Sequence, residues 1–279
     1  MKKGVGTLCF APGMKLKEIF AQAKKCGFDG VELWLGLEGE VRVDMTDAEI
    51  AQIKKDASEA GIELYSLATL LGWSVSLTSN DEKERETAKK YAKRQIEIAA
   101  GLGCDTILVV PGHVGVDFAP ELGVVDYDLA YERSLNAMKE LAPHAEKYGV
   151  VIGVENVWNK FLITPLEMRN FIDEVNSPFV QAYFDVGNVL VNGYPEQWIK
   201  ILGSRIKKVH FKDFKRSIGN LDGFCDILAG DVNYPEVMKA FKSIGYDNWV
   251  TAEVGVYPID NTVQLMHTSN AMGTIINLK

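Results

Sequence analysis

Eight apolar, strand-like runs alternate with helical patterns from one end of this chain to the other. The runs cover residues 4–10, 30–35, 62–68, 106–112, 150–156, 180–188, 206–214 and 249–254. Alternation of this kind favours parallel strands joined by right-handed helical crossovers. We therefore predict an α/β protein, and eight strand–helix units fit a closed (β/α)₈ TIM barrel. A doubly wound open sheet is the alternative, but no glycine-rich phosphate loop follows the first run.

The helical segments between these runs carry recognisable end signals. Thr46 and Glu49 fit a capping box at the start of one helix, and Pro165 follows Thr164 at the start of another. Five helices end in a glycine that leads into the next strand, in the segments CGFDGVEL, AGIELYS, LGCDTILV, YGVVIGVE and IGYDNWVTAE. Other helical patterns cover residues 80–102, 127–148, 195–202, 234–244 and 260–277. One strand–helix unit is thus repeated, and residues 1–279 are predicted to form a single barrel domain.

Composition and charge argue against several classes of protein. The chain has 30 Lys plus Arg and 38 Asp plus Glu, and this net charge of −8 argues against nucleic acid as the main partner. No apolar run approaches the roughly 18 residues of a transmembrane helix, so no membrane contact is expected, and the first residues lack the features of a signal peptide. The four cysteines are far apart and form no CxxC pair, which is typical of free thiols in a reducing compartment. We therefore expect a cytoplasmic protein that acts on a small molecule. The sequence leaves open whether the protein forms a homo-oligomer.

Four potential metal ligands stand at the ends of four successive runs in the second half of the chain. They are Glu155 in VVIGVEN, Asp185 in VQAYFD, His210 in IKKVH and Glu253 in WVTAE. Each residue alone has an ordinary explanation, such as a solvated glutamate, a turn aspartate or a core histidine. In parallel barrels, however, the carboxyl ends of the strands meet at one functional face, so the four together indicate one site. Three carboxylates and one imidazole suit Mn²⁺, Mg²⁺, Co²⁺ or Zn²⁺, and the lack of a thiolate argues against a structural zinc site.

Neighbouring side chains extend the predicted site. Strand alternation places Lys212 on the same side as His210, which lies two residues earlier. Lys212 or Arg216 is predicted to bind a substrate hydroxyl or a phosphate, whereas Lys215 fits a solvated lysine-rich loop equally well. His113 follows the fourth run at the same end of the barrel and is a pocket candidate. Three tryptophans at or just after strand ends are candidates for packing on a sugar: Trp34, Trp73 and Trp158.

Five segments of the chain resemble the xylose isomerase-like barrel superfamily, in its sugar phosphate isomerase/epimerase branch. They are GVEN (153–156), FDVGN (184–188), VHFKD (209–213), AGDVNYPEVMKAF (229–241) and TAE (251–253). The site pattern is most similar to that of ketose 3-epimerases and xylulose 5-phosphate 3-epimerases. The resemblance implies that Glu155, Asp185, His210 and Glu253 bind one divalent metal, usually Mn²⁺. It also implies that the two glutamates act as acid and base on opposite faces of the substrate.

The resemblance further implies substrate contacts, and here the chain departs from the ketose epimerases in two places. Arg216, six residues after His210, matches an arginine that contacts the substrate. Asn188, by contrast, stands where those enzymes have a histidine, and the stretch NVWNKF after Glu155 lacks their additional glutamate. The DVGN form looks more like the phosphosugar members. Both a sugar and a sugar phosphate therefore stay open as substrates.

From these residues we predict a divalent-metal-dependent sugar or sugar-phosphate epimerase or isomerase. One of Glu155 and Glu253 would remove the proton beside a ketose carbonyl, and the other would return a proton after a metal-bound enediolate has formed. In the first alternative, the same enolate expels a β-hydroxyl, which would make the protein a dehydratase or lyase acting on an inosose- or dehydroshikimate-like ring. In the second, the chain is a non-catalytic sugar-binding barrel, and the two intact glutamates argue against it.

Overall fold

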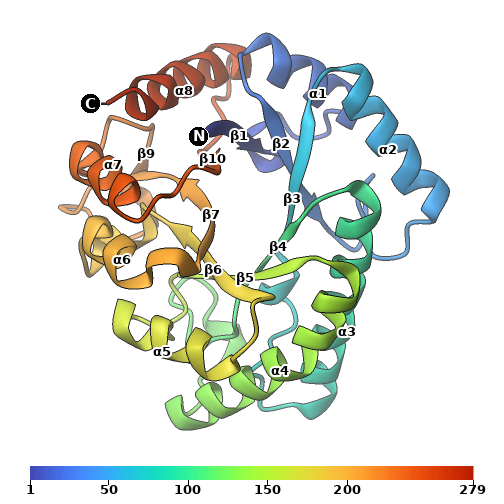
Figure 1. Cartoon of the computed structure of the whole chain (residues 1–279), viewed down its shortest axis with the longest axis vertical. Helices are drawn as coiled ribbons and strands as arrows, with labels where there is room; N and C mark the ends of the chain where they lie inside the picture. Colours follow the sequence, from blue (N-terminus) through green and yellow to red (C-terminus); the bar gives the residue numbers. More distant parts are fainter. Residues whose placement is uncertain (279) are drawn as a thin grey trace.

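Eight parallel strands form a closed barrel, and an outer ring of eight helices surrounds it (Figure 1). The computed structural model describes residues 1–278; Lys279, the last residue of the predicted domain, lies outside them. The barrel strands are β1 (Lys2–Gly6), β2 (Gly30–Leu35), β3 (Glu63–Thr69), β4 (Thr106–Val109), β5 (Val151–Glu155), β6 (Val180–Asp185), β7 (Ile206–Phe211) and β10 (Trp249–Ala252). The barrel closes through parallel pairing of β1 with both β2 and β10. The predicted TIM-barrel fold is therefore confirmed.

The helices begin and end where local capping signals place them. They are α1 (Leu16–Lys25), α2 (Asp47–Glu59), α3 (Glu82–Leu102), α4 (Tyr127–Tyr148), α5 (Pro165–Val175), α6 (Pro195–Leu202), α7 (Tyr234–Ser243) and α8 (Asn261–Ile276). Thr46 and Glu49 form the expected capping box, and the Thr164 hydroxyl accepts a hydrogen bond from the Glu167 amide. The five predicted helix-ending glycines all have positive φ, which suits a residue without a Cβ atom: Gly27, Gly61, Gly103, Gly149 and Gly245. None of the helices within residues 1–278 is long and apolar enough to cross a membrane.

Several predicted strands were too long at their carboxyl ends. The first was expected to continue to residue 10, but β1 ends at Gly6 and the chain turns into a short 3₁₀ helix, Thr7–Cys9. Cys9 and Phe10 are nevertheless buried in the apolar layer under the helices. Buried loop residues of this kind are as apolar as strand residues. The sequence pattern therefore did not show where the strands end, and the predicted strands included part of the loops at the functional face.

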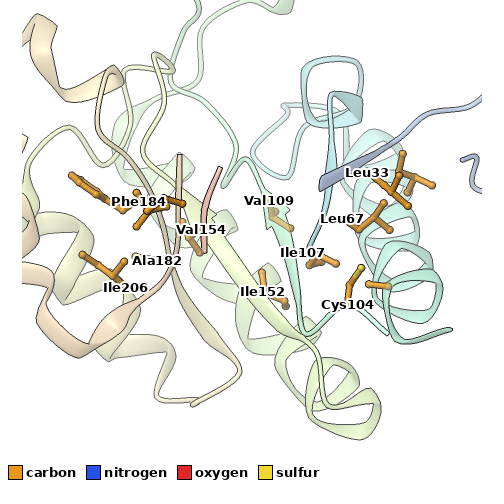
Figure 2. Packing of buried hydrophobic residues seen from close by; sticks show 14 of the residues in the cluster. Leu33, Leu67, Cys104, Ile107, Val109, Ile152, Val154, Ala182, Phe184 and Ile206 are labelled. Carbon is orange, nitrogen blue, oxygen red and sulfur yellow. The ribbon is translucent and has the colours of Figure 1, made fainter. Parts of the chain in front are cut away.

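Strand alternation separates an apolar layer from a polar barrel interior. Successive residues of a strand point to opposite faces. Val154 and Phe184 belong to the hydrophobic cluster between strands and helices, as Figure 2 shows. Their neighbours Glu155 and Asp185 therefore point to the barrel axis. Burial of the apolar residues against the helices thus fixes the direction of the acidic side chains.

The loop after β7 has structure of its own. A two-stranded antiparallel sheet joins β8 (Asp213–Phe214) to β9 (Phe224–Cys225), where the sequence indicated only a long loop. The buried Asp213 carboxylate accepts hydrogen bonds from the backbone amides of Phe214, Leu228 and Val232 at 2.9–3.1 Å. These bonds tie the two ends of the loop together, so the loop forms a defined wall at the functional face of the barrel.

Candidate metal and substrate site

The four side chains singled out at the strand ends lie together at the carboxyl end of the barrel. Glu155 and Asp185 are the last residues of β5 and β6, His210 is near the end of β7, and Glu253 directly follows β10. Each offers one ligand atom, and these atoms all lie within 4.8 Å of one another. Asp185 and His210 are fully buried, whereas the side chain of Glu253 keeps 23% of its surface exposed. The cluster is therefore shielded below and open on the side of β10.

The polar atoms of this cluster converge on one point. The Nδ1 atom of His210 lies 2.7 Å from Glu253 Oε2 and 3.8 Å from both Glu155 Oε1 and Asp185 Oδ2. Within residues 1–278, His210 Nδ1, Asp185 Oδ2 and Glu253 Oε2 make no contact with hydrogen-bond geometry. Buried polar atoms normally have such a partner. Their close neighbours are one another and the Lys212 ammonium, and one imidazole with several carboxylates at this spacing fits a divalent cation, so the donor set can hold a metal.

Burial and neighbouring charges perturb the pKa values of the three carboxyl groups. Burial raises the pKa of Glu155 to about 8; Lys212 opposes this shift and the charge of Glu253 adds to it. Burial also opposes ionisation of Glu253, but Lys212 and His210 lower the pKa of that carboxyl overall. Burial raises the pKa of Asp185, again against the effect of Lys212. When ionised, these buried carboxylates repel one another. A divalent cation bound between them would relieve the repulsion.

A fourth acidic residue, Glu32 of β2, supports the site from below, and it was not among the predicted site residues. Its Oε1 lies 2.8 Å from His210 Nε2, and its Oε2 accepts a hydrogen bond from the Tyr183 hydroxyl. Glu32 is fully buried, and Ser66 is also within 3.3 Å of the Tyr183 hydroxyl. A carboxylate on Nε2 fixes the ring so that Nδ1 faces the three clustered carboxylates. The available signal was a carboxylate in the middle of the buried run GVELWL, where an unpaired charge is costly.

Two asparagines hold Asp185 in place. The side-chain amide of Asn156 donates to the Asp185 carbonyl and accepts from the Asp185 amide, each at 2.8 Å. The Asn188 amide donates to Asp185 Oδ1 at 2.8 Å, and its side chain donates to the Asn156 carbonyl. These bonds occupy Oδ1 and leave Oδ2 facing the cluster. Asn156 was not among the predicted site residues, although it lies in the GVEN segment.

The structure separates the two predicted basic residues. Lys212 reaches into the cluster, with its Nζ 2.9 Å from Glu253 Oε1 and 3.2 Å from Asp185 Oδ2. Arg216 instead lies on the exposed loop after β8, where its guanidinium donates to the Gly193 carbonyl and packs over the Tyr194 ring. Alternation along β7 therefore placed Lys212 correctly, whereas the position of Arg216 depends on how the following loop folds.

The remaining predicted substrate residues lie at different depths. Trp34 packs on the inner layer formed by Ala68, Leu108 and Tyr183, and its indole nitrogen has no partner within residues 1–278. Trp158 donates from its indole to the Asn188 carbonyl at 2.9 Å and packs against aromatic rings of the loop after β7. Both tryptophans thus lie close to the residues that surround the cluster.

His113 has a different environment. It is buried, and its backbone exchanges hydrogen bonds with the Thr78 hydroxyl at 2.7–2.8 Å. Burial lowers the pKa of its imidazole, although Glu84 and the backbone at Leu122 act in the opposite direction. The contacts of His113 therefore run to the neighbouring loop and not to the four clustered groups.

Comparison with known proteins supports the sequence resemblance. A family model described as xylose isomerase-like TIM barrel matches residues 20–270. A fructoselysine 3-epimerase of Shigella flexneri is 23% identical over 279 residues, which covers 91% of this chain and 90% of that protein. An L-ribulose-5-phosphate 3-epimerase of Salmonella paratyphi A is 23% identical over 243 residues, which covers 80% and 76% of the two chains. A crystal structure of D-psicose 3-epimerase in the presence of D-fructose shares the fold, with a TM-score of 0.82, 21% identity and 98% coverage of both chains. On the family match across most of its length, the chain belongs to the xylose isomerase-like TIM barrel family.

Proposed function

We propose that this protein is a divalent-metal-dependent 3-epimerase of a ketose or ketose phosphate, and thus an isomerase. The observation that carries the proposal is the approach of two glutamates from different strands to one point. Glu155 comes from β5 and Glu253 from the end of β10, and β6 and β7 lie between them in the barrel. Two carboxylates that flank one carbon are what removal and return of a proton require. Relatives named as sugar epimerases support the same reaction type.

The ion would be held by Glu155, Asp185, His210 and Glu253, with Mn²⁺ as our first choice and Mg²⁺, Co²⁺ or Zn²⁺ as alternatives. Its contribution is Lewis-acid polarisation of the ketose carbonyl and of the neighbouring hydroxyl. Oxygen-rich ligand sets with one imidazole are compatible with each of these metals. Glu32, through its contact with His210 Nε2, orients the imidazole in this arrangement.

We assign both proton transfers to the two glutamates. One of Glu155 and Glu253 takes the proton from the carbon beside the carbonyl, and the electron pair of the broken C–H bond forms the enediolate. The other glutamate gives a proton to the opposite face of the same carbon, which restores the ketose with inverted configuration. Lys212, at 2.9 Å from Glu253, stabilises the carboxylate form of that residue. Proton exchange with water then returns each of the two carboxyl groups to its starting protonation state for the next turnover.

Substrate binding is assigned to the side chains around this centre. Trp34 and Trp158 offer aromatic surfaces for the carbon chain of the sugar, and Asn188 and Lys212 offer polar contacts. We keep Arg216 and His113 as proposed substrate contacts. To contact the substrate, the Arg216 side chain would have to break its hydrogen bond to the Gly193 carbonyl.

Binding of the metal should be visible as a gain in stability. At a free Mn²⁺ concentration ten times the dissociation constant, the free energy of unfolding should rise by about 1.4 kcal/mol, because only the folded chain presents all four ligands. Thermal unfolding of chelator-treated protein with and without Mn²⁺ measures the change. Asp185→Asn should lose most of the gain. An unchanged unfolding temperature with Mn²⁺, Mg²⁺, Co²⁺ and Zn²⁺ would argue against the metal site.

The reaction can be tested by isotope exchange. The Mn²⁺-loaded protein is incubated in D₂O with a panel of ketoses, ketose phosphates and inososes. We expect deuterium at the carbon that is inverted, with no other change of mass, because the proton passes through an exchangeable carboxyl group. Deuterium at the neighbouring carbon would point to aldose–ketose isomerisation, and loss of one water would identify a dehydratase or lyase. Binding without exchange would favour a non-catalytic sugar-binding barrel.

A further inference from the structure

We propose that a cavity beside the four clustered groups binds a substituent carried by the sugar, namely an aliphatic group that is uncharged or bears an amine. This inference rests on the proposed function, because it names the class of ketose that the site accepts. The cavity has a volume of about 440 Å³, which is within the range of small-molecule sites. The loops after β4, β5, β6 and β8 line it.

The cavity adjoins the candidate catalytic site, because three of its lining residues also contact that site or its supporting residues. Asn156 and Asn188 line the cavity, and both hold Asp185 by hydrogen bonds of 2.8 Å. Trp158 also lines the cavity and donates its indole hydrogen to the Asn188 carbonyl. A sugar held at the cluster would therefore lie next to this opening, and a group attached to the sugar could extend into it.

The walls of the cavity are largely apolar. Trp158, Leu162, Val189 and Trp198 provide side-chain surface for an aliphatic chain. Leu162 adopts a positive φ of 52°, and both Leu162 and Val189 are buried. A non-glycine residue in this conformation requires support from its surroundings, so the loop after β5 is held in a specific form around the cavity.

Charge distinguishes the class of substituent. The charged residues that line the cavity are Asp117, Lys160 and Asp222. Lys160 forms an exposed ion pair with Asp117 at 2.7 Å, and with Asp222 the lining carries two negative charges against one positive charge. A phosphate normally needs uncompensated Lys, Arg or converging backbone amides. The cavity therefore favours a neutral or cationic group and disfavours a phosphorylated one.

A rim substitution provides the test. Val191 lines the cavity and is 45% exposed, so Val191→Trp should fill the space without disturbing the core. Leu221→Trp, on the loop after β8 and 46% exposed, is a second variant with the same purpose. Val263→Trp is the matched control because Val263 is 43% exposed on α8, outside the cavity lining.

The probes are fructose, fructose with a butylamino group at its first or last carbon, and fructose phosphorylated at those carbons. Binding to the Mn²⁺-loaded protein is measured by calorimetry, and turnover by deuterium exchange. We expect a butylamino ketose to be preferred over fructose at least tenfold in Kd. Val191→Trp and Leu221→Trp should each reduce this preference at least tenfold, whereas Val263→Trp should keep it.

The possible outcomes test the cavity assignment and the epimerase proposal separately. Exchange on fructose or on a fructose phosphate with no preference for the butylamino ketoses would overturn the cavity assignment and leave the epimerase proposal standing. A preference in binding that both rim variants abolish would support the cavity, and if neither these probes nor the wider panel of ketoses and ketose phosphates showed exchange, the epimerase proposal would be contradicted. Tightest binding of a phosphorylated probe, or a preference unchanged in both folded rim variants, would overturn the cavity assignment.

Discussion

Glu155→Gln should lower kcat by about 10³-fold or more while the barrel stays folded. The amide keeps the shape of the side chain but can neither accept nor return the proton at the reacting carbon, and general acid–base catalysis contributes about 10²–10⁴-fold. Loss of one anionic ligand adds to the effect. Burial raises the pKa of Glu155 to about 8, so at pH 7 the metal-free carboxyl is mostly neutral and glutamine is a close replacement; we therefore expect no loss of stability.

The measurement is single-substrate turnover at saturating Mn²⁺, with circular dichroism and thermal unfolding as checks of the fold. Glu146→Gln, an exposed glutamate near the end of α4, is the matched control and should behave as wild type. Metal content is determined for each variant because weak metal binding and lost proton transfer reduce turnover in the same direction. A metal-loaded Glu155→Gln protein with near-wild-type turnover would remove Glu155 from the proposed reaction.

Glu32→Gln should weaken Mn²⁺ binding by about 10- to 100-fold, although Glu32 is not one of the four proposed ligands. Carboxylates that bind the outer nitrogen of a ligating histidine orient the ring and increase its basicity, and their loss typically has an effect of this size. In the variant, the Tyr183 hydroxyl and His210 Nε2 meet a neutral amide in place of a carboxylate. The imidazole is then less strongly held with Nδ1 toward the metal.

Calorimetric titration of the chelator-treated protein with Mn²⁺ gives the dissociation constant directly. Tyr183→Phe keeps the Glu32 charge and should have a smaller effect on metal affinity, which separates the role of the carboxylate from that of the hydrogen-bond network. Glu63→Gln, an exposed glutamate at the start of β3 that pairs with Lys2, is the control for a charge change elsewhere in the barrel. An affinity for Mn²⁺ within twofold of wild type in a folded Glu32→Gln protein would contradict this positioning role.

Local signals were sufficient for the fold and for the position of the four clustered groups. The apolar runs marked the strands, and capping residues such as Thr46 and Thr164 marked the helix starts. Because all strands of a parallel barrel end at the same face, polar residues at the ends of separate runs could be assigned to one site before any contact was known. Alternation along a strand then placed Lys212 beside His210, and the structure agrees.

Other features depend on contacts between distant segments. Glu32 reaches His210 across 178 residues of sequence, and only closure of the barrel places β2 and β7 around the same interior. The position of Arg216 follows from the two-residue strands β8 and β9, which are too short to show a periodic pattern. The cavity is formed where four loops meet, so no single segment encodes it.

The sequence by itself therefore determined the barrel and the row of acidic and histidine residues at the strand ends, since periodicity, caps and strand direction are properties of short segments. The tertiary structure alone decided which group supports His210, where Arg216 lies and what shape and charge the neighbouring cavity presents. Those properties arise from side chains of different strands and loops that meet only when the barrel closes, and hydrophobic packing of the outer faces fixes that closure.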